Sequence, residues 1–214
     1  MAPFSMVSTY EDNVFINCPF DDSYKSAFNA LVFAIHDAGF LARRALEVDN
    51  AAQFRLQKIL DIISECRYGI HDISRTELDA STNLPRFNMP LELGIFLGCR
   101  AFGGETHKTK VCLVVDTEPH RYQKFISDIA GQDVFAYNGD RGKLIHGLRG
   151  WLRTSSRRSN IPGAAAIQMR YSLFEEELPR ICEKLSLQIS ELTFLDFITI
   201  VTEWLSIHPL LESQ

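Results

Sequence analysis

The segment Lys110-Val111-Cys112-Leu113-Val114-Val115-Asp116 is a run of five apolar residues bounded by a lysine and an aspartate. An apolar run of this length without alternating polar residues is typical of a strand that is buried on both faces. Both faces of a sheet are buried when helices cover it above and below, as in parallel sheets. The segment therefore predicts a central strand of a parallel sheet.

Segments with strand and helix patterns alternate along the chain around this run. The predicted strands are 14–18, 40–46, 68–73, 110–116 and 133–137. The predicted helices are 24–38, 53–66, 89–102, 119–129 and 143–152, where apolar residues recur at helical spacing. Such alternation is typical of α/β folds whose parallel strands are joined by helical crossovers. We therefore expect a doubly wound, mostly parallel five-stranded sheet.

The composition excludes several classes of partner. The chain has 214 residues, 46% of them hydrophobic, and a formal net charge of −5. This charge gives no general attraction to nucleic acid or to an anionic membrane, so a small molecule or a protein is the expected partner. The five cysteines are odd in number and lack metal-ligand spacing, which indicates a reducing, cytoplasmic setting and no metal site. No signal peptide and no membrane-spanning run is predicted.

The last quarter of the chain changes character. Segment 154–166 is rich in Ser, Arg, Pro and Gly and predicts a linker, and its basic residues suit a solvated helix end or, less directly, a phosphate contact. Segments 168–185 and 190–207 predict two amphipathic helices with more apolar residues than one solvated face needs. We therefore divide the chain into an α/β domain at 1–157 and a linker with C-terminal helices at 158–214. Those helices are expected to cover a sheet edge or to pack on a second copy, giving a homo-oligomer.

One carboxylate lies in an apolar stretch at the start of a predicted helix. The stretch reads Leu84-Pro85-Arg86-Phe87-Asn88-Met89-Pro90-Leu91-Glu92-Leu93-Gly94. A glutamate among apolar neighbours is unfavourable unless it is solvated, paired or used in chemistry. A carboxylate of this kind can stabilise or capture the positive charge that builds on a ribose when its N-glycosidic bond breaks. Glu92 is therefore the candidate catalytic group, and an ordinary helix-surface glutamate is the alternative.

Other polar residues follow the predicted strands, and each has a structural alternative. Asp72 ends the strand 68–73 and suits a ribose hydroxyl or a loop cap. Phe20 is suited to stacking on a base, and Asp21 to substrate binding or to capping the helix that follows it. Arg86 suits a diphosphate or a plain surface position, and Asn88 suits a sugar hydroxyl or a helix cap. His71, within the same strand as Asp72, is more typical of a core histidine than of a base.

Several nucleotide-binding and hydrolase motifs are absent. The chain contains neither GxGxxG nor GxxxxGK[ST], which disfavours a tightly held dinucleotide cofactor and P-loop hydrolysis. It also lacks GxSxG, so the sequence does not support an α/β-hydrolase triad.

Three stretches together resemble one group of bacterial proteins. They are Phe15-Ile16-Asn17-Cys18-Pro19-Phe20-Asp21, Ile70-His71-Asp72-Ile73-Ser74 and Asn88-Met89-Pro90-Leu91-Glu92-Leu93-Gly94. They are similar to the TIR-like and nucleoside 2-deoxyribosyltransferase-like domains, over roughly residues 13 to 150. The resemblance implies a TIR-like or flavodoxin-like sheet, with Glu92 as the nucleophile before Leu-Gly and Asp72 as the sugar contact.

The resemblance also implies a function. Bacterial TIR enzymes use a helical glutamate to split nicotinamide from NAD, often as antiviral effectors, so we expect a hydrolase with NAD as substrate and with no bound cofactor. A homo-oligomer or a defence-system partner protein is expected to accompany it. The alternative is a non-catalytic module that senses a nucleotide signal and relays it to a partner through the C-terminal helices.

Overall fold

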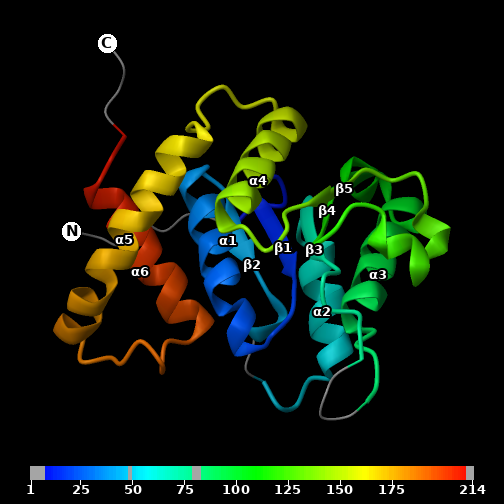
Figure 1. Ribbon diagram of the computed structural model, residues 1–214, viewed down its shortest axis with the longest axis horizontal. Coiled ribbons are helices and arrows are strands. Elements are labelled where there is room, and N and C mark those ends of the chain that lie inside the picture. Colours follow the sequence, from blue (N-terminus) through cyan, green and yellow to red (C-terminus); the bar gives the residue numbers. More distant parts are fainter. Residues whose placement is uncertain (1–7, 48–49, 79–82, 211–214) are drawn as a thin grey trace.

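The computed structural model describes residues 8–47, 50–78 and 83–210, and in this part of the chain five parallel strands form one sheet. The strands are β1 (Asn13–Asn17), β2 (Leu41–Arg43), β3 (Tyr68–Asp72), β4 (Val111–Asp116) and β5 (Val134–Ala136). Their order is β2-β1-β3-β4-β5, and every neighbouring pair is parallel. The predicted doubly wound α/β fold is confirmed (Figure 1).

The helices that the structure describes cover both faces of this sheet (Figure 1). They are α1 (Lys25–Asp37), α2 (Arg55–Ser64), α3 (Asn88–Phe102), α4 (Arg141–Ser156), α5 (Ala164–Lys184) and α6 (Phe194–Ile207). Helices α1 and α4 pack on one face and α2 and α3 on the other. Successive side chains of β1 show the two faces, because Val14 and Ile16 join the α1 cluster whereas Phe15 joins Ile63 of α2 and Phe96 of α3.

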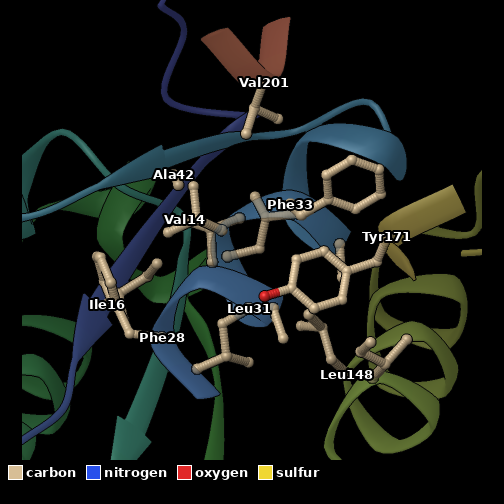
Figure 2. Packing of buried hydrophobic residues seen from close by; sticks show 14 of the residues in the cluster. Val14, Ile16, Phe28, Leu31, Phe33, Ala42, Leu148, Tyr171 and Val201 are labelled. Carbon is tan, nitrogen blue, oxygen red and sulfur yellow. The ribbon is translucent and has the colours of Figure 1, made fainter. Parts of the chain in front are cut away.

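The C-terminal helices form a further layer outside α1 and α4. Helix α5 packs on both of them, and α6 packs on α1 and α5. Figure 2 shows side chains from β1, α1, α4, α5 and α6 meeting in one cluster, with Phe33 of α1 near Tyr171 of α5. The Phe33 ring lies 5.3 Å from that of Tyr171 and 5.7 Å from that of Trp204 in α6. The apolar faces of α5 and α6 are therefore buried mainly against the helical layer, and α6 also contacts the turn η2 (Ala45–Glu47) after the edge strand β2.

Two local predictions are wrong. Segment 119–129 is not one helix, since it forms the short 3-10 turns η4 (Arg121–Lys124) and η5 (Ser127–Ile129). Arg121 contacts Asp116 and the carbonyl of Ile73, which holds this segment close to the sheet instead of along a helical axis. The second strand ends at Arg43 and is followed by the 3-10 turn η2 (Ala45–Glu47). A further 3-10 turn, η3 (Glu105–Thr109), follows α3.

The predicted linker is shorter than expected and is tied to the domain. Helix α4 continues to Ser156 and α5 begins at Ala164, so the connection spans 157–163. Arg149 donates to the carbonyl groups of Ile161 and Pro162, and Arg158 pairs with Asp12 and donates to the carbonyl of Gly39. These arginines serve as structural contacts, which supports the helix-end interpretation of the basic segment.

Buried asparagines at the two ends of β1 position the helices of the second face. Asn13 donates from its side chain to the carbonyl of Glu65, just after α2. Asn17 donates to the carbonyl of Met89 in the first turn of α3, at 2.8 Å, and its amide nitrogen lies 3.0 Å from Nδ1 of His71. The parallel register sets Asn17 beside His71, so one side chain joins β1, β3 and α3.

We expect Asn17→Leu to lower the free energy of unfolding by about 2–3 kcal/mol, because a buried carbonyl group and a buried imidazole nitrogen lose their donor. Asn160→Leu is the control, since Asn160 is exposed on the connection between α4 and α5. Urea unfolding followed by circular dichroism measures both variants. Equal stability of the two variants would contradict a positioning role for Asn17.

Candidate functional site at the carboxyl ends of β1 and β3

The order of the strands places a crevice between β1 and β3. The chain leaves β1 toward β2 on one side, and it leaves β3 toward β4 on the other. In doubly wound sheets, ligands bind at the carboxyl ends of strands where the winding reverses in this way. Residues 18–24 follow β1 at this point, Ile73 and Ser74 follow β3, and α3 begins beside both. Four of the six predicted site residues lie on these segments, Asp72 is the last residue of β3, and Arg86 lies two residues before α3.

Glu92 is the fifth residue of α3, and it is buried, with 6% of its surface exposed. The structure shows no hydrogen bond and no ion pair within 4 Å for this carboxylate in the described part of the chain. Burial raises its pKa to about 7, and the guanidinium groups of Arg55 and Arg44 offset only part of that effect. Glu92 is therefore a carboxyl group that is close to half protonated at neutral pH, as general acids and bases often are.

Arg44 is a cation beside Glu92 that the sequence analysis missed. It follows β2, with 8% of its surface exposed. Its guanidinium carbon lies 4.0 Å from the centre of the Phe20 ring and 4.3 Å from that of Phe28. The only sequence signal was a pair of arginines, Arg43 and Arg44, ending an apolar strand. Arg43 is explained by its ion pairs with Glu47 and Glu65, whereas Arg44 has no ion pair in the described residues.

Phe20 lies over this region, as a base-stacking role requires. Its ring is 44% exposed and contacts Arg44 on one side, and the guanidinium carbon of Arg55 lies 5.5 Å from the ring centre. Arg55 is the first residue of α2, and it also acts on the charge of Glu92. The predicted site residues Phe20 and Glu92 thus share Arg44 and Arg55 as neighbours, although they come from different segments.

Asp72 is fully buried and is satisfied by internal donors. Its carboxylate accepts hydrogen bonds from the Tyr24 hydroxyl at 2.5 Å, the Tyr137 hydroxyl at 3.1 Å and the backbone N–H of Ser74 at 2.8 Å. Burial raises the pKa of Asp72, and these three donors oppose the rise. The contacts explain a buried aspartate without a ligand, so its predicted contact with a sugar stays a prediction. No pattern in the sequence indicated the two tyrosines, which lie 48 and 65 residues from Asp72 along the chain.

Asp21 and Arg86 lie near each other, as two parts of one binding surface would. The Arg86 guanidinium lies 3.5 Å from the Asp21 carboxylate, and Arg75 lies 4.0 Å from it. Asp21 also caps η1 (Asp22–Tyr24) by accepting from the backbone N–H of Tyr24, so the capping alternative holds for it. Its predicted role in substrate binding stays a prediction.

Asn88 is exposed at the first position of α3 and does not cap the helix. The N-cap residue is Phe87, and it makes no side-chain capping bond. Since the Asn88 side chain makes no hydrogen bond to the residues that the structure describes, the capping alternative is wrong. The side chain is available at the edge of the crevice, where the sequence predicts a contact with a sugar hydroxyl.

His71 is a core histidine. It is fully buried, packs edge-on against Phe96, and has its Nδ1 beside the Asn17 amide. Burial lowers its pKa to about 3, so the imidazole is neutral and carries its proton on Nε2, which has no partner among the described residues. His71 therefore helps to position α3 and does not act as a base.

A cavity of about 240 Å³ adjoins this neighbourhood. Phe20, Asp21 and Arg44 line it together with residues of α1, α5 and α6, and Glu92 is not among its lining residues. Arg44 is thus the residue that both lines the cavity and acts on the carboxyl group of Glu92.

Metal binding and membrane insertion find no support in the described part of the chain. No group of three or more His, Cys, Asp or Glu side chains there is arranged to hold a metal ion. None of its helices combines the length and the apolar character needed to cross a membrane.

The chain matches no protein-family model, no curated protein and no solved structure in the three comparisons made.

The raised pKa of Glu92 predicts a pH-dependent stability. Between about pH 4.5, its ordinary value, and about pH 7, the folded chain holds a proton at Glu92 that the unfolded chain releases. This group therefore makes the fold less stable as pH rises through that window. We expect Glu92→Gln to remove this pH-dependent loss of stability. The free energy of unfolding of the variant minus that of the wild type should be about 1–3 kcal/mol more positive at pH 8 than at pH 4.

Urea unfolding at pH 4, 6 and 8 measures this difference. Glu118→Gln is the matched control, because Glu118 is exposed and has no ion pair in the described residues, so its pH dependence should equal that of the wild type. A Glu92→Gln variant that is less stable at pH 8 than the wild type would indicate a structural ion pair instead.

Proposed function

We propose that the chain is a hydrolase that breaks the ribosyl N-glycosidic bond of NAD or of a related nucleotide, with Glu92 as the group that acts on the ribose. The observation that carries this proposal is a buried carboxylate that has no hydrogen bond to any residue the structure describes, one turn into a helix at the crevice between β1 and β3. A carboxylate that the fold leaves unpaired in this place is free to meet positive charge on a bound sugar.

The substrate class follows from the number of carboxylates that the crevice offers. Glycosidases that expel a neutral alcohol need a second carboxyl group to protonate the leaving oxygen. Here three donors form hydrogen bonds to Asp72, and Arg86 and Arg75 lie beside Asp21. Of these three carboxylates, Glu92 is the one without a hydrogen bond or an ion pair in the described residues. The nicotinamide of oxidised NAD is already cationic and leaves as a neutral base without a proton. One carboxylate is sufficient for such a substrate.

In the proposed reaction, the bond between C1′ of the ribose and the pyridine nitrogen breaks, and its electron pair stays on that nitrogen. Ionised Glu92 stabilises the oxocarbenium character of C1′ or captures it covalently. Water then adds its oxygen to C1′ and releases one proton, so the products are nicotinamide, ADP-ribose and a proton. The pKa of about 7 means that a substantial fraction of Glu92 is ionised at neutral pH, and bound positive charge increases that fraction.

The other predicted residues take supporting roles in this proposal. Phe20 stacks on a base, since its exposed ring already lies on a guanidinium. Arg86, at 41% side-chain exposure, contacts the diphosphate, and Asn88 contacts the ribose from the start of α3. Asp72 acts through Tyr24 and Tyr137 to fix the segment after β1. A cytoplasmic role in antiviral defence, with a homo-oligomer or a partner protein, is proposed on the resemblance to TIR enzymes.

A non-catalytic nucleotide sensor is the second candidate, and one observation favours it. Only 6% of the surface of Glu92 is exposed, while the neighbouring cavity reaches helices α5 and α6. A module that reports binding to a partner through its C-terminal helices needs a site that touches those helices. Turnover of NAD separates the two candidates.

We expect the purified protein to release nicotinamide from NAD, and Glu92→Gln to lower the rate by at least about 100-fold, because the amide cannot supply the negative charge that the ribosyl cation needs. Chromatography of nicotinamide and ADP-ribose measures the reaction. Glu118→Gln should keep the wild-type rate.

The assay is run over a range of protein concentrations, so that assembly does not limit it. Equal rates for Glu92→Gln and the wild type would rule out Glu92 as the reacting group. Binding of NAD without nicotinamide release at any protein concentration would favour the sensor.

A further inference from the structure

The cavity beside Glu92 lies between the sheet domain and the C-terminal helices. The segment after β1 and the first turns of α1 form one wall, and Leu178 of α5 and the start of α6 form the other. A second cavity of about 600 Å³ continues it along α1 and α5. The residues that line both cavities are Asp22, Lys25, Asn29, Leu178, Ile189 and Phe197. Apart from Phe20 and Asp21, the residues that line this space have no part in the proposed hydrolysis at Glu92.

Arg44 gives the cavity an anion-binding group. Only 8% of its surface is exposed, and its Nε is buried without a hydrogen-bond partner in the described residues. Two phenylalanine rings flank the guanidinium, and no carboxylate of residues 8–47, 50–78 and 83–210 forms an ion pair with it. A buried cation without an anion is unfavourable, and burial lowers the pKa of Arg44. An incoming anion would supply the missing partner.

The remaining lining indicates which anion fits. The rings of Phe20, Phe28, Phe194 and Phe197 give flat apolar walls, and Lys25 adds a second cation. The carboxylates of Asp21 and Asp22 also line the cavity, and Arg75 and Arg86 lie within 4.0 Å of Asp21. The first turn of α6 contributes less, since Thr193 and Asp196 already cap each other reciprocally. A volume of about 240 Å³, continued by the second cavity, suits a planar ring that carries one phosphate.

We propose that this cavity binds a mononucleotide, with its phosphate on Arg44 and its base against the phenylalanine rings. The ligand would lie against α5 and α6 as well as against the segment after β1. The cavity is therefore an effector site, formed only because the C-terminal helices pack on α1.

Occupation of this site acts on Glu92 through Arg44. The guanidinium favours the ionised form of Glu92, and a bound phosphate would engage the same cation and add its own negative charge. Binding of the anion and ionisation of Glu92 therefore oppose each other, and the coupling is reciprocal. This consequence rests on the proposed function: a mononucleotide in the cavity inhibits the hydrolase.

Isothermal titration calorimetry with adenosine 5′-monophosphate at pH 8 tests the binding. We expect Arg44→Met to weaken it by at least about ten-fold, because a charge-assisted pair with the phosphate is lost. Ile189→Trp should weaken it similarly by filling the cavity while leaving Arg44 in place, whereas Ile207→Trp, at the exposed end of α6, should bind as the wild type. Thermal melting shows that each variant is folded.

Two further ligands separate the contributions. Adenosine lacks the phosphate and should bind at least about ten-fold more weakly than the monophosphate. If inorganic phosphate binds as tightly as the nucleotide, the base makes no contribution and the mononucleotide assignment falls. Equal binding of the monophosphate to the wild type and to both Arg44→Met and Ile189→Trp would overturn the site itself.

The coupling is tested with Glu92→Gln, which should bind the monophosphate about three- to ten-fold more tightly at pH 8, because the competing charge is gone. Unchanged affinity would overturn the link to Glu92. The results remain distinguishable from those of the hydrolase assay. Nicotinamide release without monophosphate binding rejects only the effector site, and binding that depends on Arg44 without nicotinamide release rejects only the hydrolase.

Discussion

The hydrogen bond from the Asn17 side chain to the carbonyl of Met89 is the constraint on which the candidate site depends. It joins β1 to the first turn of α3, and the same amide nitrogen lies beside Nδ1 of His71. One buried amide group thereby links β1, β3 and α3, which fixes their relative positions. Glu92 lies three residues beyond Met89, so the position of its carboxylate follows from this contact.

Two buried carboxyl groups near the crevice differ in the hydrogen-bond donors that the fold supplies to them. Asp72 receives three internal hydrogen bonds that join the segment after β1, β3 and the end of β5. Glu92 receives none in the described residues and has a pKa of about 7. A buried carboxylate that receives several hydrogen bonds has a structural role, whereas a buried carboxylate without donors is available to a ligand. This contrast supports Glu92, more than Asp72, as the reacting residue.

The sequence predicted the sheet because hydrophobic periodicity reports burial, most clearly in the strand Val111–Asp116, whereas the three-residue strand Leu41–Arg43 was predicted too long. It failed at 119–129, where tertiary contacts of Arg121 override an apolar pattern that resembles a helix. Glu92 stood out as an isolated charge in an apolar stretch. Arg44, Tyr24 and Tyr137 did not, because their importance comes from pairings between distant segments, which one sequence does not display.

Arg44 connects the two halves of the molecule. Its guanidinium lies between the rings of Phe20 and Phe28, lines a cavity bounded by α5 and α6, and acts on Glu92. If the C-terminal helices only stabilised α1, an apolar residue at position 44 would bury equally well without the cost of an unpaired cation. An arginine that has aromatic faces but no anion is better explained by a ligand that brings the anion. On this argument α5 and α6 complete a binding site, and their packing on α1 makes the state of Glu92 sensitive to what that site holds.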